Sequence, residues 1–326
     1  MNGYKMLAQV TAVGMIVGVA NAPINPTAHA DVTLLSADGP LAGSETALIL
    51  GGTTEPMPST EFAQTAENLF LNPLGFDGGA TGSTVCDMIG TDPCAAPLQV
   101  LTTPELIQQG PSSLTGASDV VLAVENEFNA NPGAFSAEHP LTIFGYSQSA
   151  TVESIAMTRL EAAGIPSADL HFVFIGDPSL PVTGVWSNLE ADMDSVLGPS
   201  LTNTLLTDFG MNAVLGNVTP DDLYPATIYS LDTDPVSNFQ EEFATKGLFG
   251  ALLDIFGPHV EYLGLTPTEV AGATTTTDGD LTLVNIPLPT DNVDAWLSAV
   301  FLHGAADSGL LQSIFGSLEL LFTNTF

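Results

Sequence analysis

The sequence predicts an α/β protein with a mostly parallel central sheet that helices cover on both faces. Three observations predict it. Short apolar segments typical of strands recur along the chain, segments with helical apolar spacing lie between them, and Gly-containing turns follow several of the strands. Strands that alternate with helices pair in parallel, because each helix carries the chain back across one face of the sheet.

Four short apolar segments are predicted strands. They are residues 46–50, 141–144, 170–175 and 226–231. Residues 117–128 carry apolar side chains at helical spacing and are a predicted helix, and a second helix is predicted at about residues 150–163. Gly164 followed by Pro166 is a typical stop signal and is expected to end that second helix.

A long Leu-, Asn- and Gly-rich segment with no clear strand separates the third and fourth predicted strands, at about residues 179–225. Connections of this length are usually functional, so we expect an inserted cap over the site. The apolar run at residues 293–326 has helical spacing and is expected to pack against the core, with a membrane or partner contact as the alternative. With no repeat and no linker, residues 31–326 are predicted to form one domain.

The N-terminus resembles an export signal. Lys5 precedes an apolar stretch at residues 6–20, and an A-x-A cleavage pattern follows at residues 28–30. We therefore predict a signal peptide over residues 1–30 and a secreted or cell-envelope protein, with an uncleaved membrane anchor as the alternative. Cys86 and Cys94 agree with export, because an oxidising compartment favours a disulfide between them over two separate thiols.

The charge balance narrows the range of partners. The chain has three Lys and Arg residues and 37 Asp and Glu residues, which gives a formal net charge of −34. Such a surface repels phosphate backbones and offers no basic patch to anionic lipids, so we expect no nucleic-acid partner. Neither cysteine has a neighbouring histidine, and the sequence predicts no metal site and no cofactor.

The clearest chemical signal is the order strand, Gly145-Tyr146-Ser147-Gln148-Ser149, helix. A serine on a sharp turn between strand and helix presents its hydroxyl above the sheet edge, and the crowded backbone requires small residues two positions before and after it. Gly145 and Ser149 meet this requirement. Ser147 is therefore the predicted nucleophile of an α/β-hydrolase fold, and a helix-capping serine is the alternative.

A serine hydroxyl needs a base, and His259 is the predicted one. It follows Gly257-Pro258, which marks a loop, and it lies after the last predicted strand. His29 belongs to the signal, His139 precedes the strand that leads to Ser147, and His171 lies inside an apolar strand. His303 lies in the apolar C-terminal run. The hydrolase chain order of serine, acid and histidine fits His259.

The triad acid is expected just after a strand between Ser147 and His259. Asp177, Asp232 and Asp234 all meet that condition, and the residues alone leave the three open. The oxyanion hole is predicted from the N–H of Gln148 and from Gly52 and Thr53, because a Gly-rich loop after the first strand lets the backbone approach a substrate closely.

At these residues the chain resembles the PE-PPE domain of mycobacteria, a serine α/β hydrolase related to cutinases. The resemblance rests on TALILGGTTEPMP at 46–58, FGYSQSA at 144–150, FIGDP at 174–178, and DPVSNF at 234–239 followed by HVEY at 259–262. It favours Asp234 as the acid, since Asp234 matches the first Asp of the D-x-x-[AS]-D-F segment. Asn238 replaces the second Asp, which would matter if that position held the acid. A signal-like segment stands where the family has its helical PE or PPE leader.

The resemblance implies an esterase acting on short to medium acyl chains. The sequence therefore predicts a secreted serine esterase or lipase-like hydrolase whose substrate is a lipid-like acyl ester bound under an apolar cap. Two alternatives remain, an acyltransferase acting on trehalose-type glycolipids and a catalytically inactive envelope protein with the hydrolase fold. Peripheral association with the cell envelope is a further expectation.

Overall fold

A computed structural model gives the fold. The structure describes residues 39–78, 82–287 and 292–303, and the predicted signal peptide lies outside them. The described part is built on an eight-stranded sheet in the order β2-β3-β1-β4-β5-β6-β8-β7. The strands are β1 (Ala47–Leu50), β2 (Val85–Asp87), β3 (Leu98–Val100), β4 (Leu141–Tyr146), β5 (Leu170–Ile175), β6 (Ala226–Leu231), β7 (Thr274–Asp278) and β8 (Leu281–Ile286).

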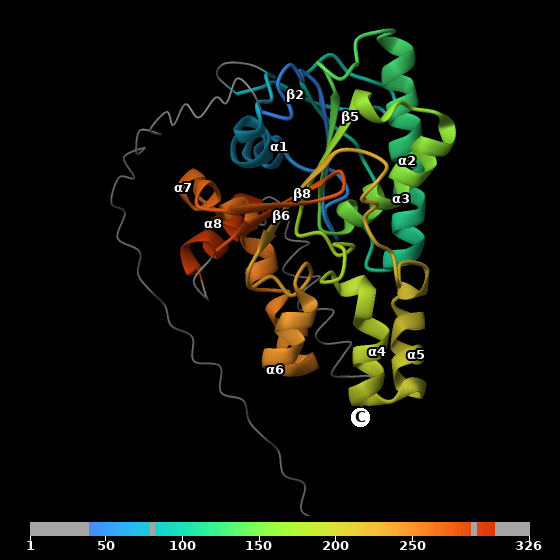
Figure 1. Cartoon of the computed structure of the whole chain (residues 1–326), viewed down its shortest axis with the longest axis vertical. Coiled ribbons are helices and arrows are strands. Elements are labelled where there is room, and N and C mark those ends of the chain that lie inside the picture. Colours follow the sequence, from blue (N-terminus) through green and yellow to red (C-terminus); the bar gives the residue numbers. More distant parts are fainter. Residues whose placement is uncertain (1–38, 79–81, 288–291, 304–326) are drawn as a thin grey trace, which may run out of the picture. The chain divides into compact units, whose positions relative to one another are not determined.

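The sheet is parallel apart from β7, which pairs antiparallel with β8 (Figure 1). The four predicted strands correspond to β1, β4, β5 and β6. The predicted mostly parallel α/β sheet is therefore confirmed.

Helices follow most of the strands. They are α1 (Thr60–Ala66), α2 (Gln109–Ala130), α3 (Gln148–Ala163), α4 (Val185–Leu197), α5 (Pro199–Asp208), α6 (Phe239–Asp254), α7 (Pro267–Ala271) and α8 (Val293–His303), with short helices η1 (Glu67–Leu71), η2 (Asn72–Leu74), η3 (Ser167–Asp169), η4 (Met211–Ala213) and η5 (Pro258–Gly264). No described helix has the length and apolar character needed to cross a bilayer.

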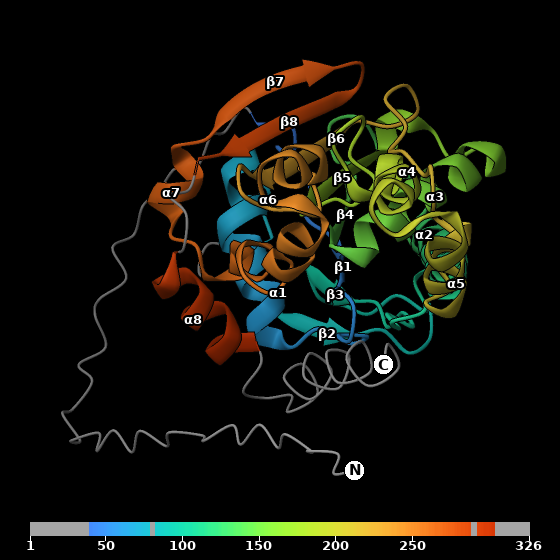
Figure 2. The same ribbon diagram turned by 90° about the horizontal axis from the view of Figure 1, so that it is seen from below.

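Both faces of the sheet are buried, which explains why its inner strands are continuous apolar runs. Successive strand residues point to opposite faces. In β5, Phe172 and Phe174 pack in one core with α2 and α3, whereas Val173 and Ile175 pack in a second core with α1, η1 and η5. Figure 2 shows α2 and α3 on one side of the sheet and α1 and α8 on the other.

The chain leaves β1 and β4 toward opposite faces, because α1 packs on one face and α3 on the other. These two strands are neighbours, with Leu50 beside Gly145. In open parallel sheets, a change of direction between neighbouring strands leaves a crevice at their carboxyl ends, where ligands bind. The loop after β1 and the turn after β4 meet at this crevice.

A helical layer lies at one end of the sheet (Figure 1). α4 and α5 occupy the segment where the sequence predicts the cap. α6, which follows β6, packs with them in a third apolar cluster that includes Trp186, Leu206 and Phe239. The cap layer is therefore α4, α5 and α6, so it also contains residues beyond the expected 179–225. α6 bends at Gly247, whose φ of 71° suits a residue without a Cβ.

Several elements differ from the sequence predictions. β2 and β3 have three residues each, too few for an apolar run to be recognised. β7 consists of exposed Thr and Asp residues with no apolar alternation. His259 follows β6, the last predicted strand, and the two strands that were not predicted, β7 and β8, come after it. α2 begins at Gln109 rather than 117, since its first turns contain Gly110, Pro111 and Gly116, which weaken a helical pattern.

The predicted disulfide joins Cys86 in β2 to Cys94 in the following loop. It closes a short loop at the sheet edge, where β2 has a neighbour on one side. At the other end of the chain, α8 packs as expected, with Ala295 and Ala299 buried. The remaining residues of that run, 304–326, lie outside the described part.

Candidate active site

Ser147 lies on a sharp turn between β4 and α3. Its φ of 57° and ψ of −115° are unusual for a residue with a side chain, and such strain persists only where the surroundings hold it. Here the Ser147 N–H donates to the carbonyl of Ile175 on β5, and the Ser147 carbonyl accepts from the N–H of Ala150. The turn presents the hydroxyl at the carboxyl end of the sheet, as the sequence predicts.

Small residues around the turn are explained by close approaches. A Cβ on Gly145 would come within 2.4 Å of Glu153 Oε1, so the buried Glu153 side chain leaves room only for glycine. A Cβ on Gly52 would lie 3.1 Å from the Tyr146 ring and 3.4 Å from Ser147 Cβ. Gly52, in the loop after β1, is therefore in direct contact with the turn.

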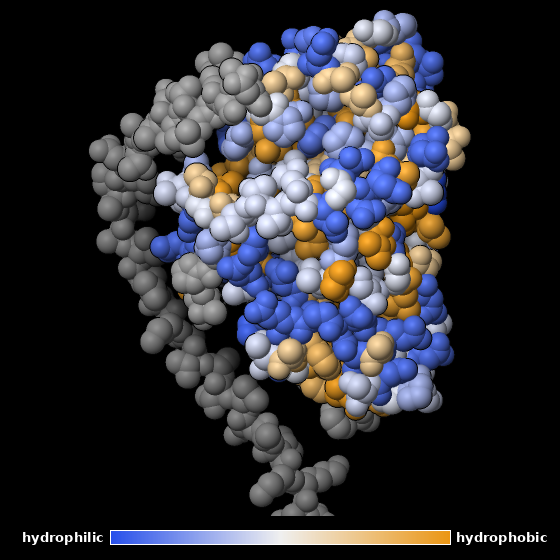
Figure 3. All heavy atoms as spheres, in the orientation of Figure 1, coloured by the Kyte–Doolittle hydropathy of each residue, from blue (hydrophilic) through white to orange (hydrophobic). Residues whose placement is uncertain are grey.

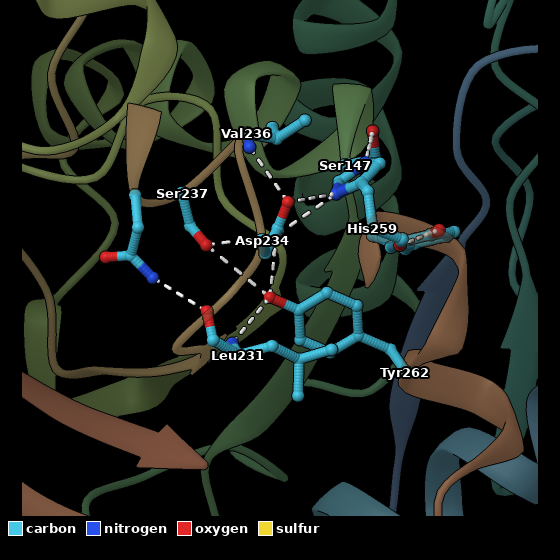
Figure 4. Close-up of polar contacts among 9 residues, drawn as sticks. Ser147, Leu231, Asp234, Val236, Ser237, His259 and Tyr262 are labelled. Carbon is cyan, nitrogen blue, oxygen red and sulfur yellow. Dashed lines mark hydrogen bonds and ion pairs between the residues drawn. The ribbon is translucent and has the colours of Figure 1, made fainter. Parts of the chain in front are cut away.

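His259 is in contact with Ser147. Its Nε2 lies 2.8 Å from Ser147 Oγ, and it sits in η5, just after Gly257 and Pro258 (Figure 4). The Tyr146 hydroxyl donates to the His259 carbonyl at 2.7 Å, which holds the backbone of the loop. A Cβ on Gly176 would lie 2.8 Å from the imidazole, so a glycine at the end of β5 makes space for the ring.

Asp234 completes the arrangement from the loop after β6. Its two carboxylate oxygens lie 3.0 and 3.1 Å from His259 Nδ1. They also accept hydrogen bonds from the Val236 N–H, the Ser237 hydroxyl and the Tyr262 hydroxyl (Figure 4). Asp234 is fully buried. Burial raises the pKa of its carboxyl, but attraction to His259 and the hydrogen bonds from His259, Val236 and Tyr262 outweigh burial and leave the pKa below its ordinary value.

The other two acid candidates are directed elsewhere. Asp232 accepts a hydrogen bond from the side chain of Asn285 on β8. Asp177 is buried and accepts hydrogen bonds from the Ser179 N–H and the Thr219 hydroxyl, and burial raises its pKa to about 6. In the described part, Asp234 is the candidate that contacts His259.

The other histidines do not join the arrangement. His139 is exposed and bonds the Gly43 carbonyl near the start of β4. His171 is packed in the sheet against the Thr227 hydroxyl, and burial lowers its pKa to about 4. His29 and the side chain of His303 lie outside the described residues.

Three residues that form hydrogen bonds within the candidate site were not assigned a role from the sequence. Tyr262 donates to Asp234 and accepts from the Leu231 N–H at 3.0 Å. Ser237 also donates to Asp234, and Gln109 at the start of α2 donates to the Thr53 hydroxyl. The spacing of Tyr262 could have indicated its role. Tyr262 lies three residues after His259, and side chains three residues apart lie on the same face of a 3₁₀ helix.

The predicted oxyanion residues lie beside Ser147. Gln148 is the first residue of α3, so its N–H belongs to a helix N-terminus, where partial positive charge accumulates. The Thr53 hydroxyl donates to Gln148 Oε1 at 3.1 Å and accepts from the Gln109 side chain at 3.1 Å. These bonds link the loop after β1 to the two helices, which limits how far Gly52 and Thr53 can move.

A pocket of about 410 Å³ opens at Ser147 and His259. Apolar side chains from the cap layer, η5 and α8 line most of it. They include Val185, Trp186, Leu189, Met193, Leu205, Leu206, Leu252, Ile255, Phe256, Leu263 and Ala299. Gly52, Thr53 and Gln109 line its polar end. Ser147 and His259 thus lie at the end of an apolar pocket.

The model of the PE-PPE domain family matches residues 95–278, more than half of the 326-residue chain. The chain belongs to the PE-PPE domain family. The matched part of this PE-PPE domain includes Ser147, Asp234 and His259, whereas Gly52 and Thr53 precede it.

Similar curated proteins come from Mycobacterium tuberculosis. Esterase PE16 is 29% identical over 259 residues, which are 77% of this chain and 42% of PE16. PPE family protein PPE28 is 26% identical over 238 residues, 71% of this chain and 31% of PPE28. The PE-PPE domain chain therefore spans less than half the length of these relatives.

Among solved structures, a cutinase-like protein from Cryptococcus sp. is similar with a TM-score of 0.33 and 16% identity, over 68% of this chain and 97% of that one. RedJ, a thioesterase from the prodiginine biosynthetic pathway in Streptomyces coelicolor, is similar with a TM-score of 0.32 and 15% identity, over 85% of this chain and 86% of RedJ.

Proposed function

We propose that this PE-PPE domain is a serine esterase that cleaves lipid-like acyl esters through an acyl-enzyme. The observation that carries the proposal is the continuous set of contacts from Asp234 through His259 to Ser147 Oγ, at 3.0 and 2.8 Å. Such an arrangement is the one that activates a serine hydroxyl in unrelated hydrolases. The family relative named Esterase PE16 supports the same reaction class.

In the proposed mechanism, His259 accepts and returns a proton in both acylation and deacylation. Ser147 Oγ attacks the ester carbonyl carbon while His259 Nε2 takes the hydroxyl proton, and Asp234 stabilises the imidazolium. The N–H of Gln148 and donors of the loop after β1 stabilise the oxyanion. When the bond to the leaving alcohol breaks, His259 returns the proton to that alcohol. Water then attacks the acyl-serine with His259 as base, and Ser147 regains its proton as the acid leaves.

The substrate class follows from the pocket. Its walls are mainly apolar, and the described side chains around it offer no cation to an anionic group. A neutral ester with a hydrocarbon chain would place the chain against the cap layer and the carbonyl at Ser147. The formal net charge of −34 further disfavours anionic substrates.

The direct test is hydrolysis of p-nitrophenyl acyl esters by the wild type and Ser147→Ala. We expect the variant to lose at least about 10⁴-fold in kcat, with an unchanged circular dichroism spectrum. Ser200→Ala is a matched control, because Ser200 is exposed on α5 and should keep wild-type activity. Equal activity of Ser147→Ala and the wild type would refute the proposal, and acyl trehalose formed when trehalose is added would favour acyl transfer.

We further propose that the protein is secreted and acts at the cell envelope. Support comes from the signal-like sequence of residues 1–30 and from the Cys86–Cys94 disulfide, which suits an oxidising compartment. The N-terminal sequence of protein recovered from the medium or envelope fraction should begin at Asp31. Recovery of full-length protein from the cytoplasm alone would contradict export.

A further inference from the structure

A buried carboxyl group lies directly behind the loop after β1. Glu105 follows β3 and is 1% exposed, with a φ of 40° that is unusual for a residue with a side chain. Its carbonyl accepts the N–H of Thr54 at 2.7 Å, and Thr103 N–H donates to the Pro56 carbonyl at 3.1 Å. The segment around Glu105 therefore runs along the loop that contains Gly52 and Thr53.

The Glu105 side chain reaches the turn at Ser147 through Ser149. Glu105 Oε1 accepts the Thr103 hydroxyl at 2.7 Å and lies 3.1 Å from Ser149 Oγ. Ser149 Oγ also donates to the Gly51 carbonyl. Because a hydroxyl has one hydrogen, Ser149 can donate fully to Gly51 only if the proton in its contact with Glu105 belongs to the carboxyl.

The electrostatic surroundings favour that protonated carboxyl. Glu105 Oε2 has no partner in the described part, and Glu153 on α3, the titratable group with which Glu105 interacts electrostatically, is also an acid. The two described cations, Arg159 and Lys246, make their bonds elsewhere. Burial raises the pKa of Glu105 to about 7, although hydrogen bonds from Thr103 and Ser149 oppose the shift.

We propose that Glu105, in its neutral form, is a positioning residue that holds the loop of residues 51–54 through Ser149, so that this loop is ready to receive the oxyanion. The inference rests on the proposed esterase function and adds a role that the triad does not include. Glu105 does not line the pocket, so it acts through Ser149 and Gly51 rather than on the substrate.

Ionisation of Glu105 removes the contact that holds the loop of residues 51–54 in place. A carboxylate needs the Ser149 hydrogen for itself, which leaves the Gly51 carbonyl without its donor beside a negative charge. The loop of residues 51–54 then loses a fixed point next to Gly52 and Thr53. Because oxyanion contacts strengthen in the transition state, we expect kcat to fall while KM changes little.

The test is the pH dependence of kcat for a neutral ester, measured in the wild type, Glu105→Gln and Glu127→Gln. The wild type should lose about tenfold in kcat per pH unit above about pH 7, until the activity of the ionised form is reached. Glu105→Gln should lack this decline, because its amide stays neutral. Glu127 is a matched control, also 1% exposed and with a pKa raised by burial, but bonded to Asn131 at the end of α2.

A decline of equal slope in Glu105→Gln and the wild type, or no decline in the wild type, would overturn the inference. If Glu105→Gln does not fold, Ser149→Ala tests the same link, because it removes the hydroxyl between Glu105 and Gly51. We expect it to lower kcat at pH 6 and to lose the decline, and a wild-type profile in Ser149→Ala would overturn the inference.

The same samples separate this inference from the proposed function. A fluorophosphonate probe that labels Ser147 in the wild type, with equal pH profiles in all variants, would refute the role of Glu105 and leave the esterase proposal standing. A wild type that neither labels nor hydrolyses esters would overturn both.

Discussion

At the scale of single residues, four groups converge on the Asp234 carboxylate. His259 Nδ1, the Val236 N–H, the Ser237 hydroxyl and the Tyr262 hydroxyl all lie within hydrogen-bond distance of it. A buried carboxylate with this many donors stays ionised, and its orientation is fixed. It can therefore hold the imidazole in the tautomer that presents Nε2 to Ser147.

Asp234→Asn and Asp232→Asn form a matched pair that tests the assignment of the acid. Asp234→Asn should lower kcat by about 10⁴-fold, since the amide favours the wrong imidazole tautomer. Asp232→Asn should keep wild-type kcat, because Asp232 bonds Asn285 away from the imidazole. The measurement is kcat on a p-nitrophenyl ester, and the opposite ranking of the two variants would assign the acid to Asp232.

The choice between these two acids shows where sequence reasoning stops. Both follow the same strand and both are aspartates, so the residues alone did not separate them. Tertiary contacts separate the two acids. Asp232 accepts a hydrogen bond from Asn285 on β8, whereas Asp234 contacts His259, which lies in η5. The family resemblance favoured Asp234, and the contacts in the structure agree with that choice.

At the scale of elements, the cap layer shapes the proposed acyl pocket. Leu205 on α5 lines the pocket, whereas Leu201 on the same helix is 41% exposed and does not. Leu205→Trp should therefore shift the preference toward shorter acyl chains, by about 10- to 200-fold for each methylene group that no longer fits. Leu201→Trp should keep the wild-type profile, so kcat/KM across a series of acyl lengths distinguishes them. The same shift in both variants would contradict this role of α5.

The Cys86–Cys94 disulfide closes a short loop at the edge of the sheet. Replacing Cys86 and Cys94 together by Ala should lower the free energy of unfolding by about 2–3 kcal/mol, because a short closed loop is released in the unfolded chain. Urea unfolding monitored by circular dichroism measures the change. Wild-type protein treated with reductant should match the double variant, and an unchanged midpoint in both would show that the bond contributes nothing to stability.

The elements that sequence reasoning found are those whose signals are local. β4, the turn at Ser147 and α3 form one continuous stretch, in which an apolar strand, small residues and a helix follow each other. β2 and β3 have three residues each and gain their strand character from tertiary pairing, β3 with β1 and β2 with β3. α6 was missed as part of the cap because its role comes from packing against α4, which no local pattern records.

At the scale of the whole molecule, we expect the many acidic residues to make the free energy of unfolding depend on pH. Figure 3 shows hydrophilic residues interspersed with hydrophobic ones over one face, and the formal net charge is −34. Buried carboxyl groups also contribute to the pH dependence of stability. Burial raises the pKa of Asp177 to about 6 and of Glu105 to about 7, so between their ordinary values near 4 and these values the folded state binds more protons than the unfolded state.

We therefore expect stability to peak near pH 4. As pH rises from about 4 to about 6 or 7, Asp177 and Glu105 ionise in the unfolded chain but stay protonated in the folded protein, so stability falls across this range. Asp234 has the opposite sign, because its pKa is lowered, so its contribution is present above about pH 4 and is lost as pH falls through its folded value.

Urea unfolding from pH 3 to pH 9 in high salt measures this dependence, because salt screens repulsion between exposed charges much more than it affects buried groups. Asp177→Asn should flatten the decline between about pH 4 and pH 6, and Glu105→Gln the decline between about pH 4 and pH 7. A free energy of unfolding that rises steadily from pH 4 to pH 8 would contradict the prediction.

Covalent labelling measures whether His259 and Asp234 activate the hydroxyl of Ser147, as proposed. A fluorophosphonate probe, followed by peptide mapping, should label the wild type at Ser147, and His259→Ala should label much more slowly. Labelling at another residue, or equal labelling rates in the wild type and His259→Ala, would contradict the proposal.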